Sequence, residues 1–114
     1  SPGVRVGEGV AIMPGVVINT GSTIGAHSII NTSASIDHDC DVGEYASIGP
    51  SATLAGEVTV GRSAFIGIGA NVAQGITVGD LSIIGGGSMV LSTIKPKAVN
   101  WGVPDRMLKI SKSD

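Results

Sequence analysis

From Val6 to Val90 the sequence carries an aliphatic residue at every sixth position, as in the segment 24–48, IGAHSIINTSASIDHDCDVGEYASI. Ile, Leu and Val make up 31 of the 114 residues, so chance would fill about four of the fifteen positions in the series. All fifteen are filled: Val6, Ile12, Ile18, Ile24, Ile30, Ile36, Val42, Ile48, Leu54, Val60, Ile66, Val72, Val78, Ile84 and Val90. The six-residue period is therefore a firm basis for predicting the fold.

Two other positions of the hexad are also restricted. Two residues before the aliphatic, ten of the fourteen positions from Val10 to Ser88 hold Ala, Ser or Cys. On a strand, residues two apart point to the same face, so a small and a large side chain would enter the interior together. The residue after the aliphatic is Gly eight times, and we expect this glycine to take the turn conformation at each corner.

Short strands and corners at a fixed spacing predict an all-β fold, a parallel β-solenoid. A period of six would scatter aliphatic residues around an α-helix, which excludes a helix. Three hexads closing an eighteen-residue triangular coil would give about five coils over residues 1–90, a β-helix domain. Residues 91–114 lose the period and are expected to form a C-terminal extension, partly an ordered cap, with Ser111 to Asp114 disordered.

Composition excludes several classes of function. A net charge of −2 and three aromatic residues argue against a nucleic-acid partner. No apolar run approaches the length of a membrane span, and the single cysteine, Cys40, excludes an internal disulfide. We therefore expect a cytoplasmic protein without a membrane partner. The two histidines, His27 and His38, are too few for a three-histidine zinc site, and no metal is expected.

His38 is the best candidate for a general base. It falls at a corner, in a column of residues eighteen apart with Thr20, Gly56 and Gln74, where Gly56 is expected to leave an open notch. A carboxylate bonded to one ring nitrogen would fix the tautomer and raise the basicity of the other. Asp37, Asp39 and Asp41 surround the histidine in sequence. The alternative is a solvated surface histidine among aspartates.

The hexads Ile24-Gly25, Ile48-Gly49, Val60-Gly61, Ile66-Gly67 and Ile84-Gly85 resemble those of left-handed β-helix hexapeptide-repeat acyltransferases. The segments 36–40 (IDHDC), 85–88 (GGGS) and 102–106 (GVPDR) resemble the C-terminal domain of the sialic acid O-acetyltransferase and nucleotide-amino-sugar N-acetyltransferase family. The resemblance spans almost the whole chain and implies a left-handed coil. In that family a nucleotide-sugar-binding domain usually precedes the solenoid, so we expect this chain to be a fragment.

The resemblance also implies a site. His38 would be the general base and Asp39 the carboxylate that orients it. Acetyl-CoA would lie between two prisms of a homotrimer, and the residues near it would be Asn31 at the acetyl group, Gly56 beside the thioester, Ile68 and Gly86 along the pantetheine arm, and Ser47 where one branch has a second histidine. Lys95, with Lys97, Arg106 and Lys109, is a candidate for the CoA phosphates.

The predicted reaction is attack of an amine or hydroxyl on the thioester of acetyl-CoA after His38 has taken its proton. The acceptor would be a UDP-amino-sugar or a sialic acid, and the sequence leaves N- and O-acetylation open. A different hypothesis is a trimeric scaffold with little or no activity, in which Leu81, at an expected polar corner, forms a contact patch. Ice binding would need stacked Thr columns, which the sequence lacks.

Overall fold

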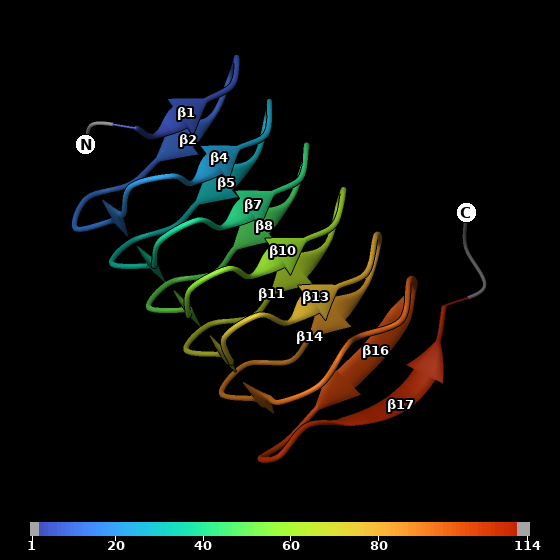
Figure 1. Cartoon of the computed structure of the whole chain (residues 1–114). Coiled ribbons are helices and arrows are strands. Elements are labelled where there is room, and N and C mark those ends of the chain that lie inside the picture. The colour runs from blue at the N-terminus through green and yellow to red at the C-terminus, as the bar shows by residue number, and fades with distance from the viewer. Residues whose placement is uncertain (1–2, 112–114) are drawn as a thin grey trace.

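The computed structural model describes residues 3–111 and shows a three-sided prism of stacked coils (Figure 1). Over residues 5–90 each side is a parallel sheet of two-residue strands, and successive strands of a sheet lie eighteen residues apart in the chain, as in the pairing of Ile36 with Leu54. The predicted eighteen-residue triangular coil is therefore confirmed. The described residues form no helix, so none of them belongs to a helix that could cross a membrane.

The first sheet contains β1 (Arg5–Val6), β4 (Thr23–Ile24), β7 (Asp41–Val42), β10 (Thr59–Val60) and β13 (Thr77–Val78). The second contains β2 (Ala11–Ile12), β5 (Ile29–Ile30), β8 (Ser47–Ile48), β11 (Phe65–Ile66) and β14 (Ile83–Ile84), followed by β16 (Ala98–Trp101) and β17 (Arg106–Ile110). The third contains β3 (Val17–Ile18), β6 (Ser35–Ile36), β9 (Thr53–Leu54), β12 (Asn71–Val72) and β15 (Met89–Val90).

The core is the axis of the prism. From Ile24 to Val90 every sixth-position aliphatic is at most 2% exposed, and the small residues two positions earlier are buried beside them. Burial of each such side chain contributes about 1.5–3 kcal/mol relative to an exposed position. Val6 and Ile12 are 49% and 45% exposed, because no described coil covers the first one. The solenoid buries a continuous core only where coils stack on both sides.

The corners correct one prediction. The residue with a left-handed φ is not the glycine after the aliphatic but the residue two positions later, as at Asp39 (φ 57°) and Gly75 (φ 75°). The glycines after the aliphatic are needed for a different reason. A Cβ on Gly67 would lie 2.6 Å from the backbone nitrogen of Gly86, in the next coil. These glycines allow neighbouring backbones to approach, and the turn is made elsewhere.

Beyond Val90 the coil shortens. Val78 is bridged to Ile94, and Ile84 pairs with Asn100, so these partners are sixteen residues apart. β16 extends the second sheet in parallel and β17 returns antiparallel to β16, which covers the last coil (Figure 1). The Ser111 N–H donates to the Lys97 carbonyl at 2.6 Å, whereas residues 112–114 of the segment predicted to be disordered lie outside the described residues.

Candidate active site

The corners stack into three edges along the prism. The His38 edge, which joins the third sheet to the first, comprises residues 19–22, 37–40, 55–58 and 73–76. The glycine edge, which joins the second sheet to the third, comprises residues 13–16, 31–34, 49–52, 67–70 and 85–88. A third edge joins the first sheet to the second. The fourth residue of most corners is buried, as at Ser22 and Cys40, whereas the second and third are mostly exposed, as at His38 and Asp39.

His38 and Asp39 form a hydrogen-bonded pair on the His38 edge. Nδ1 of His38 lies 3.0 Å from Oδ2 of Asp39, and the two side chains are 46% and 60% exposed. An ionised carboxylate can only accept, so the neutral imidazole carries its proton on Nδ1 and leaves Nε2 free to accept one. This tautomer is the one that a general base requires.

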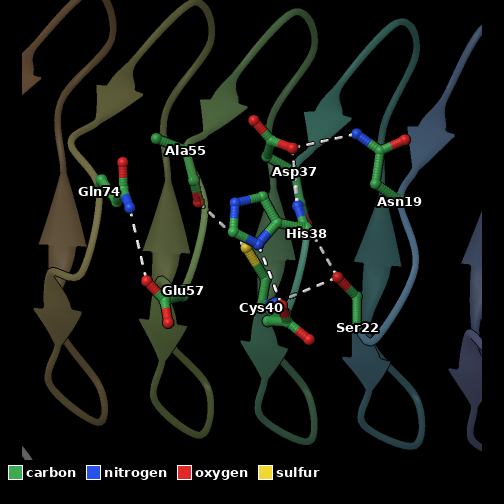
Figure 2. A network of polar contacts seen from close by, with 9 residues as sticks. Asn19, Ser22, Asp37, His38, Cys40, Ala55, Glu57 and Gln74 are labelled. Carbon is green, nitrogen blue, oxygen red and sulfur yellow. Dashed lines mark hydrogen bonds and ion pairs between the residues drawn. The ribbon is translucent and has the colours of Figure 1, made fainter.

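The backbone on both sides of His38 is held by the preceding coil (Figure 2). Oδ1 of Asp37 accepts the His38 N–H at 2.7 Å and the Asn19 amide at 3.1 Å. The Ser22 hydroxyl donates to the Asp37 carbonyl at 2.9 Å and accepts the Cys40 N–H at 3.1 Å. These contacts fix the peptide from which the imidazole projects. Neither Asn19 nor Ser22 was predicted from the sequence, although both lie eighteen residues before groups that they contact.

Charge around the imidazole favours its protonated form. The hydrogen bond to Asp39 raises the pKa of His38, burial opposes this, and the negative charges of Asp37, Asp39 and Glu57 add to the rise. The hydrogen bond from the His38 backbone, and next the one from Asn19, lower the pKa of Asp37. Glu57 is itself within 3.4 Å of the Gln74 amide. The histidine is thus a stronger base than a free imidazole.

Gly56 does not form the open notch that the column of residues predicted. The imidazole of His38 leans over the next coil, and a Cβ on Gly56 would collide with Nε2 and lie 2.8 Å from Cε1. The backbone of Gly56 is therefore buried under the ring. A side chain at this position would displace the nitrogen that is free to accept a proton.

Cys40 follows the pair but points inward. Its side chain is buried, and its thiol lies 3.1 Å from the Ala55 carbonyl, to which it donates. Burial raises the pKa of this thiol, with smaller opposing contributions from backbone hydrogen bonds. A neutral, inward-facing thiol is a poor nucleophile. Cys40 is therefore unsuited to act as a nucleophile.

The remaining predicted residues lie away from His38 in the single chain. Asn31, Ile68 and Gly86 are on the glycine edge, where a Cβ on Gly86 would lie 3.0 Å from Cγ2 of Ile68. The Asn31 side chain accepts the Thr32 N–H at 2.8 Å. Ser47 begins β8 in the second sheet, and Lys95 is exposed in the cap. One chain thus brings together only His38, Asp39 and Gly56.

The surface near His38 is open. Two hollows of about 320 and 480 Å³ lie on the C-terminal cap instead, lined by Trp101, Pro104 and Arg106 in the first and by Ile83, Val99 and Ile110 in the second. His27 is on the third edge, where its ring stacks on Tyr45 with centroids 5.2 Å apart. Among residues 3–111 there is no group of His, Cys, Asp and Glu side chains that could hold a metal ion.

No family model and no curated protein matches the chain in sequence. Solved structures do match it. The PerB protein of Caulobacter crescentus, solved with CoA and GDP-perosamine, is 47% identical with a TM-score of 0.95, over 96% of this chain and 53% of that one. The structural neighbours of this chain are left-handed β-helix acetyltransferases of the hexapeptide-repeat class.

A second neighbour is the acetyltransferase domain of PglB from Neisseria gonorrhoeae in complex with acetyl coenzyme A. It is 33% identical with a TM-score of 0.93, over 95% of this chain and 53% of that one. A maltose O-acetyltransferase from Clostridium difficile, 22% identical with a TM-score of 0.87 over 96% of this chain and 70% of that one, shares the fold alone. The predicted left-handed β-helix is confirmed, and the chain spans about half the length of the first two neighbours.

Proposed function

We propose that this chain is the acetyl-transfer domain of an acetyl-CoA-dependent N-acetyltransferase whose acceptor is the amine of a nucleotide-linked sugar. The observation that carries the proposal is the His38–Asp39 pair, which presents a free Nε2 on an open edge. The structures solved with CoA and GDP-perosamine, and with acetyl coenzyme A, support the choice of co-substrate and acceptor class.

In this mechanism the neutral amine of the sugar attacks the thioester carbonyl of acetyl-CoA. A C–N bond forms, Nε2 of His38 takes the proton that the amine loses, and the C–S bond breaks to release the CoA thiolate. The proton on His38 then passes to the thiolate, which restores the free base. Asp39 holds the Nδ1 proton throughout, which stabilises the imidazolium that forms.

The separation of the predicted residues supports a homotrimer. His38 lies on one edge, whereas Asn31, Ile68 and Gly86 lie on another. In a ring of three prisms the His38 edge of one copy would face the glycine edge of the next, and acetyl-CoA would lie between them. Three equivalent sites would then be made from two chains each, which is the arrangement that closed cyclic symmetry permits.

The test is an assay of acetyl transfer by the purified chain from acetyl-CoA to GDP- and UDP-linked amino sugars. The readout is the amount of CoA thiol that is released. His38→Gln should lower kcat/KM by roughly 10²- to 10⁴-fold, because it removes the base. His27→Asn, at a histidine on another edge, should keep the wild-type rate. Full activity in His38→Gln would reject the mechanism. If the wild type neither transfers acetyl nor binds CoA in calorimetry, the scaffold hypothesis replaces this one.

Activity should also depend on pH in a set direction. A general base must be neutral, and Asp39 raises the pKa of His38 above its ordinary 6.5. We therefore expect kcat/KM to fall as the pH is lowered through a pKa above 6.5. Asp39→Asn, which keeps the side-chain shape and tolerates the left-handed φ of 57°, should lower the rate and move this limb to lower pH. If the kcat/KM of the wild type fell through a pKa at or below 6.5, the result would contradict the pairing of His38 with Asp39.

A further inference from the structure

Gly21 lies directly before Asp39 in the stack of coils on the His38 edge. The two residues occupy the same corner position, eighteen residues apart, and the Asp39 N–H donates to the carbonyl of Thr20 at 3.0 Å. A Cβ on Gly21 would collide with Oδ1 of Asp39 and lie 2.9 Å from its Cγ. The carboxylate of Asp39 therefore lies over the bare Cα of Gly21.

The two members of the pair lean in opposite directions along the prism. The imidazole of His38 covers Gly56 in the following coil, while Oδ1 of Asp39 covers Gly21 in the preceding one. The other carboxylate oxygen, Oδ2, is the one bonded to Nδ1 of His38. In Figure 2 the ring points toward the coil of Ala55 and Glu57, away from the coil of Asn19 and Ser22. A glycine on each side thus leaves room for one half of the pair.

We propose that Gly21 is a positioning residue for His38: its bare Cα leaves the space in which the Asp39 carboxylate must lie to accept the Nδ1 proton. The inference rests on the proposed function for its effect on the rate, but its geometric content concerns only Gly21, Asp39 and His38. A side chain at position 21 would push the carboxylate away and free the imidazole to rotate.

Backbone conformation alone does not explain this glycine. Gly21 has φ +81°, but Asp39 and Glu57 hold the same corner position in the next two coils with φ of 57° and 62°. Gly75, one coil further, has φ +75°, and a Cβ added there would meet nothing within 4 Å. The left-handed conformation is thus compatible with other residues in this column, and the contact with Asp39 distinguishes Gly21.

This column provides a matched pair of variants, Gly21→Ala and Gly75→Ala. Both add a methyl group at a left-handed position, so both should lose similar thermal stability. Only Gly21→Ala should displace Asp39. We expect it to lower kcat/KM by roughly 10- to 100-fold, the effect of misplacing a catalytic group by about 1 Å, whereas Gly75→Ala keeps the wild-type value. Equal rates in the two variants would overturn the proposal.

A titration of the His38 ring protons by NMR, on the chain without CoA, tests the geometry separately. The charged groups that face the imidazole are Asp37, Asp39 and Glu57, and only the contact with Asp39 should weaken in Gly21→Ala. The pKa of His38 should fall toward its ordinary value in Gly21→Ala and stay unchanged in Gly75→Ala. An inactive wild type with this titration result would reject the proposed function but leave the role of Gly21 intact.

Two double variants complete the test. In the Asp39→Asn background, Gly21→Ala should move the His38 pKa little further, because the charge it displaces is already absent. If Gly21→Ala does not fold, Asp39→Gly in the same chain should restore folding, because it removes the carboxylate that the methyl group meets. Failure of that double variant to fold, or an unchanged His38 titration in a folded Gly21→Ala, would reject the role of Gly21.

Discussion

Glycine is frequent at two positions of the corners: the first, directly after the aliphatic residue, and the third, two residues later. A comparison of the two positions shows that glycine is favoured at each for a different reason. At the first position, as in Gly67, a Cβ would meet backbone atoms of the next coil at 2.6 to 2.9 Å. At the third position, as in Gly69, a Cβ would meet nothing within 4 Å, but φ is +66°. At Gly67 the limit is the spacing between coils, and at Gly69 it is the conformation of the residue's own backbone.

The third position holds a side chain in most corners despite its backbone conformation. Its φ lies between 57° and 81° in all fifteen corners from Gly3 to Gly87, yet eight of these corners hold a residue other than Gly. A left-handed φ costs a typical residue roughly 1–2 kcal/mol, and packing against the surrounding coils can offset this cost. An overlap with backbone atoms requires the stack itself to move. Glycine at first positions such as Gly67 therefore lets the coils approach, and at Gly69 it only eases the turn, whereas Gly21 also makes room for Asp39.

Gly67→Ala and Gly69→Ala give this comparison its largest expected effect, because they add the same methyl group two residues apart in one corner. Gly67→Ala should destabilise the chain by about 1–3 kcal/mol or more, since the peptides of Ile84 to Gly86 must shift. Gly69→Ala should lose about 1 kcal/mol or less, because reduced freedom of the unfolded chain offsets part of the strain. Thermal or urea unfolding of the two variants measures the difference.

The opposite order would contradict this assignment. If Gly69→Ala were the more destabilised variant, the glycines would serve the turn in both places and the spacing of the coils would tolerate a Cβ. A gel-filtration profile of each variant is the control, because a change of assembly would alter apparent stability without any change in the corner.

The fold could be predicted because the hexad specifies it directly. Ile36, Leu54 and Val72 recur at eighteen-residue intervals, pair in register and are at most 2% exposed. The position of the left-handed residue could not be predicted from glycine frequency, since glycine is enriched at two corner positions for different reasons. Asn100 was also unpredictable: it follows Ile84 in the core column only because the last coil is two residues shorter.

The site was predicted in part. The resemblance placed His38 next to an orienting carboxylate, and the structure shows that hydrogen bond at 3.0 Å. The roles of Asn31, Ser47, Ile68, Gly86 and Lys95 stay predictions. The period of one chain specifies which edge each of these residues occupies, but not which edge of a second chain it faces. Contacts between coils, such as Gly21 with Asp39, follow from adding eighteen to a residue number only once the coil length is known.

Replacement of Leu81 should give the smallest effect. It tests the third corner position at a residue other than glycine. It is partly buried and has φ 60°, and leucine cannot form the local hydrogen bonds that make this conformation easier for asparagine. Leu81→Asn should therefore stabilise the chain by several tenths of a kcal/mol, because relief of strain outweighs the apolar area lost, and Tm should rise by a few degrees. Leu91→Asn is the control, since Leu91 is 55% exposed and its φ is not left-handed. An equal gain in both variants would show that reduced surface hydrophobicity, and not the backbone at position 81, raises the Tm.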